Sequence, residues 1–122
     1  MADSNRRREW SIANQQVNEH AFLEMMYEDP FFPNHVLDKG TQILRRLCER
    51  IEAEQPADLH RLYELTQRAT EEFNALEAEF EAAGSGIETT AREEICEEFC
   101  FVADAYGFED ADPEELTATR EW

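Results

Sequence analysis

Apolar residues recur in alternating steps of three and four along residues 56–83, the pattern of a helix that buries one face. Thr66 fills the one place in this stripe that is not apolar. A helix with a single apolar stripe needs partner helices to cover it. We therefore expect residues 56–83 to form the central helix of an all-α domain. The stripe consists of Leu59, Leu62, Ala69, Phe73, Leu76, Phe80 and Ala83.

Two helices are predicted before this central helix. Apolar residues at helical spacing in 14–28 indicate the first, and Asp29-Pro30 ends it because the residue before a proline is pushed out of helical geometry. Residues 33–54 carry the same kind of pattern and indicate the second. Gly40 interrupts this second pattern, either as a break or as a place where another helix comes close. The central helix follows, with Pro56 expected at its first position.

Two further helices are predicted after Gly84-Ser85-Gly86, which is typical of a helix end and a turn. Thr90-Ala91-Arg92-Glu93 matches a capping box that would open the fourth helix, although Ser85 and Glu88 also permit an earlier start. Tyr106-Gly107 would end it. Asp112-Pro113, followed by two acids, indicates a short fifth helix that runs into Trp122.

No segment alternates with the period of a strand, and the connections between the expected helices are short. The sequence therefore predicts an all-α fold, an antiparallel bundle of four main helices plus a short C-terminal helix. We expect residues 1–13 to be a flexible polar arm and residues 14–122 to be a single helical domain.

The charge of the chain is strongly negative and unevenly distributed. The formal net charge is -18; residues 1–70 hold 12 acids and 9 bases, and residues 71–122 hold 17 acids and 2 bases. Such a surface repels phosphate and attracts basic partners, so we expect no direct binding of nucleic acid. Arg6-Arg7-Arg8 is the local exception.

The three cysteines are an odd number, and the chain begins without an apolar leader. Both features favour a reducing, cytoplasmic location. No apolar run approaches the length of about 20 residues that a membrane-spanning helix needs, so no membrane association is expected.

The chain contains the short motifs Met26-Tyr27-Glu28-Asp29-Pro30-Phe31-Phe32-Pro33, Val36-Leu37-Asp38-Lys39-Gly40, Phe73-Asn74 and Ala105-Tyr106-Gly107-Phe108. These motifs resemble those of a family of small, acidic bacterial proteins catalogued only as a domain of unknown function. The resemblance covers most of residues 17–122 and implies a bacterial, intracellular origin, but it transfers no catalytic residue. By analogy only, the size and charge also fit immunity proteins that neutralise toxins.

The fourth predicted helix has one acidic face. At 100° per residue, five acids fall within a sector of about 140°, and Phe101 lies among them. Either this is a solvated face and Phe101 lies beneath the N-terminal arm or the fifth helix, or an aromatic group ringed by acids binds a partner rich in Arg and Lys. The acids of this candidate binding face are Glu93, Glu94, Glu97, Glu98 and Asp104.

The turn that carries Tyr27, Phe31 and Phe32 is a second, weaker candidate for partner binding. Phe31 and Phe32 are adjacent in a turn with two prolines, so both can hardly point inward. We expect one of them in the core and the other over the end of the bundle.

No metal site, cofactor site or catalytic motif is predicted. Cys96 and Cys100 are spaced to share one helix face, but a structural zinc site needs four ligands, and only Cys48 and three scattered histidines remain. Buried, reduced thiols explain Cys96 and Cys100 better. Paired acids such as Glu97-Glu98 could do acid–base chemistry only if one were buried and the other exposed, which the sequence does not show.

The leading hypothesis is a binding protein without enzymatic activity. Its acidic face would sequester or inhibit a basic protein, such as a toxin or a nucleic-acid-binding enzyme, in the manner of an immunity protein. One alternative is a nucleic-acid mimic whose carboxylates imitate phosphates and occupy a DNA-binding enzyme or regulator. Another is an enzyme with a carboxylate-lined pocket.

Overall fold

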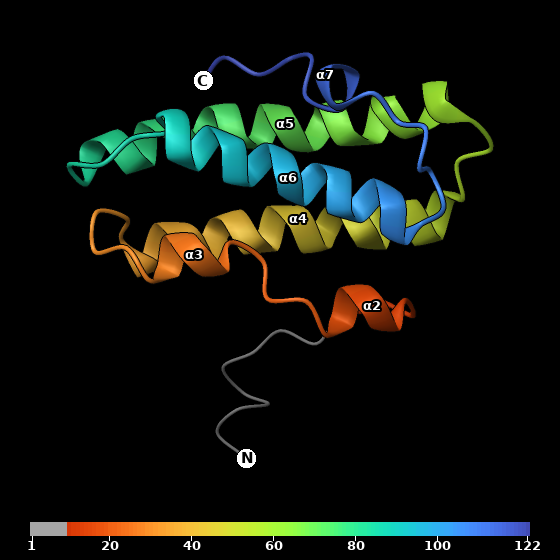
Figure 1. Cartoon of the computed structure of the whole chain (residues 1–122), viewed down its shortest axis with the longest axis horizontal. Helices are drawn as coiled ribbons and strands as arrows, with labels where there is room; N and C mark the ends of the chain where they lie inside the picture. Colours follow the sequence, from red (N-terminus) through yellow and green to blue (C-terminus); the bar gives the residue numbers. More distant parts are fainter. Residues whose placement is uncertain (1–9) are drawn as a thin grey trace.

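The computed structural model describes residues 10–122, which form six α-helices and no strand (Figure 1). The predicted all-α class is confirmed. Three of these helices are long and three are single turns. The expected number of four main helices is therefore too high by one. The long helices are α4 (Asn34–Glu54), α5 (Leu59–Ala82) and α6 (Thr89–Ala105), and the single turns are α2 (Gln15–Asn18), α3 (Glu24–Tyr27) and α7 (Pro113–Leu116).

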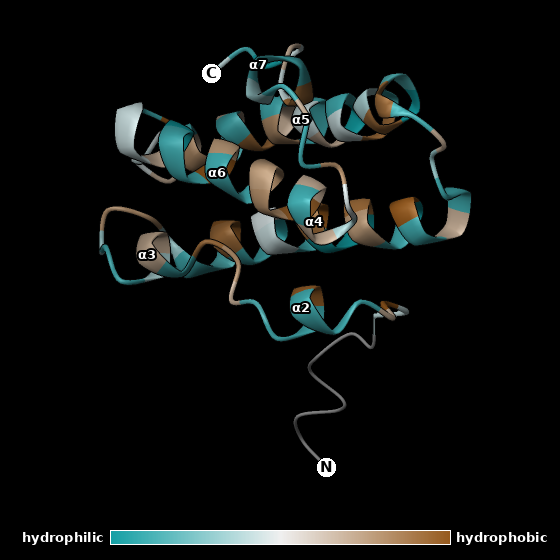
Figure 2. Ribbon diagram, turned by 45° about the vertical axis from the view of Figure 1, so that its right-hand side comes forward, coloured by the Kyte–Doolittle hydropathy of each residue, from teal (hydrophilic) through white to brown (hydrophobic). Residues whose placement is uncertain are grey.

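The chain reverses direction between α4 and α5 and again between α5 and α6, so the three long helices lie side by side (Figure 1). Each presents apolar residues along one side and hydrophilic residues along the other (Figure 2). The predicted central stripe is confirmed over most of its length, because α5 buries Leu62, Thr66, Ala69, Phe73, Leu76 and Phe80. Its two ends differ: Leu59 is half-buried and Ala83 is exposed.

Gly40 is a place of close contact and not a break, since α4 continues through it. A β-carbon built at Gly40 would lie 3.0 Å from Leu23 Cδ1 and 3.3 Å from Phe73 Cε1. The missing side chain therefore lets α5 and the segment before α3 approach the α4 backbone.

The predicted first helix is wrong as a single element, because residues 19–23 leave the helix and separate α2 from α3. Leu23 has a left-handed backbone with φ of 61°. The backbone here bonds to distant side chains: the Leu23 N–H donates to Glu98, and the His20 carbonyl accepts from Arg45. These tertiary hydrogen bonds replace those that a continuous helix would make.

Helix starts also differ from the prediction in detail. Pro56 is not the first residue of α5, because the helix begins at Leu59. Asp58 caps it by accepting from the Arg61 N–H at 2.9 Å. Helix α6 begins at Thr89, and Thr90 lies inside it, so the expected capping box is not formed. Asp112 caps α7 as expected, but this helix ends after one turn, at Leu116.

The domain begins before residue 14. Ile12 is buried in the core, and the N–H groups of Ser11 and Ala13 donate to Glu49 and Glu52 of α4 at 2.8 and 2.7 Å. The rest of the predicted arm, including Arg6-Arg7-Arg8, lies outside the described residues. Within residues 10–122, no helix combines the length and the apolar character needed to cross a bilayer.

Candidate functional site

The acids of the predicted face on α6 lie in three different environments. Glu93, Glu97 and Asp104 are exposed, Glu94 is half-buried, and Glu98 is buried. The α3 turn and the segment before it lie against this side of α6. The face is therefore partly covered, and only some of its carboxylates are accessible to a partner.

The prediction of an open acidic face is wrong at Glu98, because the side chain of Glu98 is only 9% exposed. One carboxylate oxygen lies 2.7 Å from His20 Nε2, and the other accepts from the Leu23 N–H at 2.6 Å. These two donors compensate for the burial of a carboxylate. Glu98 therefore holds the segment between α2 and α3 on α6.

Phe101 is half-buried, and its aromatic neighbours among residues 10–122 are His20 and Phe22. Its ring stacks on the imidazole of His20, with centroids 3.8 Å apart, and meets the edge of Phe22 at 5.9 Å. The segment between α2 and α3 supplies both rings. Phe101 thus packs within the fold and is not the exposed aromatic group ringed by acids that we considered.

Glu94 lies at the boundary between the covered and the open part of this face. Its carboxylate accepts from the Met25 N–H at 3.1 Å. Burial raises the pKa of Glu94, and the neighbouring charges of Glu98 and Glu97 raise it further, whereas the hydrogen bonds from the α3 backbone oppose this. Glu94 therefore differs in environment from the exposed Glu97, which lies three residues later on the same helix.

The aromatic turn has the arrangement that the sequence predicted. Phe32 is buried and packs edge-on against Phe80, while Phe31 is 46% exposed. Tyr27 is half-buried and donates its hydroxyl to Asp38 at 2.5 Å. Burial and this hydrogen bond raise the pKa of Tyr27. Of the three residues, Phe31 is the one whose side chain is available to a partner.

The acidic face and the aromatic turn meet, because α3 and the turn after it lie beside the first half of α6. Two adjoining hollows of about 290 and 210 Å³ lie between these elements and share Asp29, Phe32 and Thr90. We call the two hollows together the acidic groove. Its carboxylates belong to Asp29, Glu88, Glu93, Glu94 and Glu97, and its apolar side chains include Met25, Met26, Phe31 and Phe32.

The rim of the acidic groove carries the two exposed large apolar side chains of residues 10–122, Met25 at 73% and Phe31 at 46% exposure. None of the described residues that line it is basic. The groove thus offers carboxylates and apolar contact area together. This combination suits a ligand that is both cationic and apolar.

Sequence reasoning missed Met25, Asp29 and Glu88 as members of this site. The helical spacing in residues 14–28 includes Met25 among the apolar residues of one continuous helix, but the helix is broken at Leu23 and Met25 is exposed. The neighbouring Met26 is buried, and adjacent residues of a helix can both be buried, as Ile43 and Leu44 are in α4. The adjacency of the two methionines therefore gave no indication that Met25 is exposed.

The cysteines differ from the prediction in burial. Cys48 is buried, and burial raises the pKa of its thiol to about 12. Cys96 and Cys100 are half-buried and not fully buried. Within residues 10–122, no group of three His, Cys, Asp or Glu side chains is placed to hold a metal ion.

Fold and site together define a small all-helical protein with an acidic surface groove that has an apolar rim. A family model described as "Family of unknown function (DUF5713)" matches residues 16–122, and the chain belongs to this family. The predicted resemblance to a domain of unknown function is confirmed. No curated protein and no solved structure matches the chain.

Proposed function

We propose that this protein is a binding module, without enzymatic activity, whose acidic groove holds a basic segment of a partner protein. Binding would sequester or inhibit that partner, in the manner of an immunity protein. The observation that carries the proposal is the position of Met25 and Phe31, two exposed apolar side chains at the rim of a groove lined by five carboxylates.

The charge of the whole molecule supports this proposal at long range. A net charge of -18 attracts basic proteins and raises the rate at which they are encountered. A general field does not select a binding site, however. The groove adds that selection because it combines charge with apolar area at one place on the surface.

Local energetics also favour a cationic partner. Glu93 and Glu97 are one helical turn apart on α6, where like charges cost a few tenths of a kcal/mol. A Lys or Arg placed between them would convert this repulsion into attraction. Met25 has a flexible, polarizable side chain that adapts to different apolar partners. We therefore infer a partner segment that carries both basic residues and one or two bulky apolar residues.

The nucleic-acid mimic is the alternative within the binding class. Mimicry of a phosphate backbone needs carboxylates, whereas Met25 and Phe31 add apolar area that a phosphate backbone lacks. This difference favours a protein segment as the ligand. Duplex DNA that displaced the protein from its natural target would favour the mimic instead.

An enzymatic alternative would use the contrast between half-buried Glu94 and exposed Glu97, because acid–base chemistry needs two carboxyl groups with different pKa values. Glu94, however, already accepts a hydrogen bond from the Met25 backbone. No histidine or cysteine is among the described residues that line the groove. We therefore favour binding over catalysis.

The proposal is tested with a fluorescent probe peptide of alternating Lys and Leu residues, whose binding is followed by anisotropy. We expect Glu93→Gln with Glu97→Gln to weaken binding about tenfold, because two exposed charge pairs of up to about 1 kcal/mol each are lost. Met25→Ser should weaken it about threefold to tenfold through lost apolar contact.

A matched control removes the same charge elsewhere. Glu71 and Glu81 are exposed residues of α5, and Glu71→Gln with Glu81→Gln should change the Kd by less than about twofold. If both double variants weaken binding equally, only the general field matters. In that case the groove is not the binding site.

A further inference from the structure

A second cavity, about 570 Å³ in volume and widely open to solvent, lies beyond the C-terminal end of α6, whereas the acidic groove lies beside the first half of this helix. Its size is within the range of pockets that hold small organic ligands. It lies where α4 and α6 end, next to the segment before α2. The residues that matter for its chemistry are Asn14, Ile51, Glu52, Pro56, Tyr106 and Phe108.

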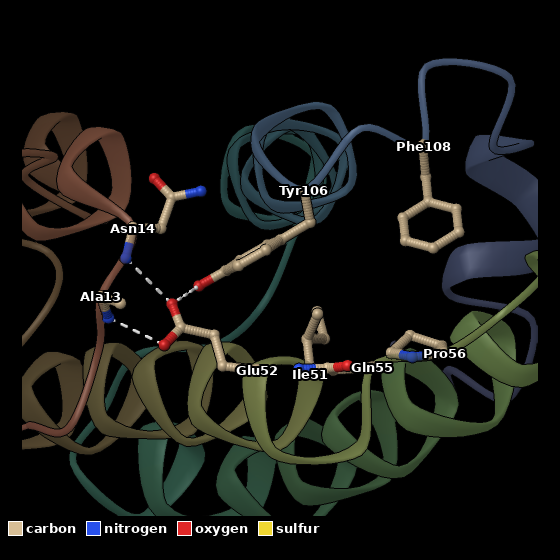
Figure 3. A pocket seen from close by; sticks show the side chains of 8 residues that line it. All are labelled: Ala13, Asn14, Ile51, Glu52, Gln55, Pro56, Tyr106 and Phe108. Atoms are coloured by element: carbon tan, nitrogen blue, oxygen red, sulfur yellow. Dashed lines mark hydrogen bonds between the residues drawn. The ribbon is translucent and has the colours of Figure 1, made fainter.

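Glu52 is the charged group of this cavity. One of its oxygens accepts from the Ala13 N–H at 2.7 Å, and the other accepts from the Asn14 N–H at 3.0 Å and the Tyr106 hydroxyl at 2.6 Å (Figure 3). Burial alone would raise the pKa of Glu52, but these three hydrogen bonds outweigh it and lower the pKa. The carboxylate is thus ionised at neutral pH.

The hydrogen bonds leave Glu52 able to accept one more donor. A carboxylate has about four acceptor positions, and the three donors fill three of them. The Glu52 oxygen that accepts from the Ala13 N–H has this one donor among residues 10–122, so the remaining acceptor position is on this oxygen. A donor from a bound molecule would complete the coordination of the carboxylate.

The walls near Glu52 are aromatic and apolar. The rings of Tyr106 and Phe108 lie on one side, and Ile51 and Pro56 lie across from them (Figure 3). Tyr106 and Phe108 are half-buried, so parts of their rings are accessible. Aromatic faces attract cations, and a low-polarity wall also takes the apolar body of a ligand.

Two helix ends add negative potential at this place. Helix α4 ends at Glu54 and helix α6 ends at Ala105, and the C-terminal end of a helix carries a partial negative charge. One of the terminal carbonyls, that of Ala105, accepts from the Asn14 side chain. The potential in the cavity therefore disfavours anions and favours cations.

From this geometry we propose that the cavity binds a small organic cation, a primary ammonium group on an aryl or alkyl body. The ammonium group donates to Glu52, and the body lies against Tyr106, Phe108 and the apolar wall. The proposal does not depend on the acidic groove, since the two sites share no lining residue.

The test uses 2-phenylethylammonium as the probe and 2-phenylethanol as its neutral counterpart with the same body. Binding to the full chain is followed by amide NMR shifts of Glu52, Tyr106 and Phe108. We expect the ammonium compound to bind about tenfold more tightly than the alcohol, because both can donate a hydrogen bond to Glu52 but only the cation also forms an ion pair with it.

Variants assign the effect to the cavity. Glu52→Gln keeps an acceptor but loses the charge, and we expect about tenfold weaker binding, whereas Glu54→Gln, on an exposed residue of the same helix, should change the Kd by less than about twofold. Phe108→Leu leaves the contacts of Glu52 intact, and should weaken binding about threefold through the lost ring face.

Three results would each overturn the proposal. They are equal affinity for the ammonium compound and the alcohol, equal losses in Glu52→Gln and Glu54→Gln, and no shift of the cavity amides up to about 10 mM probe, a concentration that corresponds to less than about 3 kcal/mol of binding. If Glu52→Gln does not fold, unchanged binding in Phe108→Leu would contradict the proposal in its place.

Discussion

Three glutamates on one side of α6 show how strongly environment separates chemically identical residues. Glu98 is buried between His20 and the Leu23 N–H, Glu94 is half-buried and holds the Met25 N–H, and Glu97 is exposed. The first two fix neighbouring segments of the fold. Only residues such as Glu97 and Glu93 are left to meet a partner.

At the residue scale we predict that Glu94→Gln stabilises the protein at pH 7. The pKa of Glu94 is raised above the ordinary 4.5, so its protonated form contributes stability that is lost as the pH rises through the folded-state value. Removing the charge should raise the free energy of unfolding by about 0.5 kcal/mol at pH 7, from two relieved like-charge contacts.

Urea unfolding at two pH values checks this prediction. At about pH 4, where the wild-type carboxyl is largely protonated, the variant should gain almost nothing. Glu93→Gln, at an exposed position, serves as the control for the general loss of charge. A stabilisation of Glu94→Gln that is the same at both pH values would contradict the assigned cause.

At the scale of elements, α3 is a helix that cannot exist alone. It has four residues, and a single helical turn is unstable in water without tertiary contacts. The buried Met26 and the carboxylates of Glu94 and Glu98 hold it on α6. The acidic groove exists only where α3 is held in this way.

We therefore predict that Glu98→Ala destabilises the protein by about 2–3 kcal/mol and loosens α3. The substitution leaves the buried Leu23 N–H and the His20 side chain without their acceptor. Hydrogen exchange of the amides in 23–27 should accelerate more than that of α5. Glu97→Ala, one residue earlier and exposed, should change stability by less than about 0.5 kcal/mol. Equal effects of the two substitutions would show that Glu98 does not hold α3.

The sequence predicted the long helices well and the short ones poorly, for a physical reason. The apolar periods of α4, α5 and α6 extend over several turns, and local sequence determines such helices strongly. The pattern in 14–28 was equally helical, but Val17 and Met26 are buried while Ala21 and Met25 are exposed. Hydrogen bonds from residues more than 70 positions away decide that break, and no local pattern contains them.

The candidate site was predictable in its parts and not in its assembly. The split between buried Phe32 and exposed Phe31 followed from their adjacency, and the exposure of Glu93 and Glu97 from the helical projection. The burial of Glu98 and the meeting of the acidic face with the aromatic turn depend on how α3 crosses α6. That packing is a tertiary property.

At the scale of the whole molecule, a general negative field coexists with two surface hollows that we propose as binding sites. The net charge of -18 attracts cations of every kind. The acidic groove and the cavity beside Glu52 lie at opposite ends of α6 and differ in shape and in neighbours. Under the proposed function, selectivity for a basic protein segment would come from the apolar rim of the acidic groove.

The most direct test of this account is an amide NMR titration of the isotope-labelled protein with the Lys–Leu probe peptide, at low and at high salt. We predict that the largest shifts occur at Met25, Phe31, Thr90, Glu93 and Glu97, and that they weaken but keep the same pattern as salt screens the general field. Shifts spread evenly over the acidic surface, or concentrated on α5 and α7, would contradict the acidic groove as the binding site.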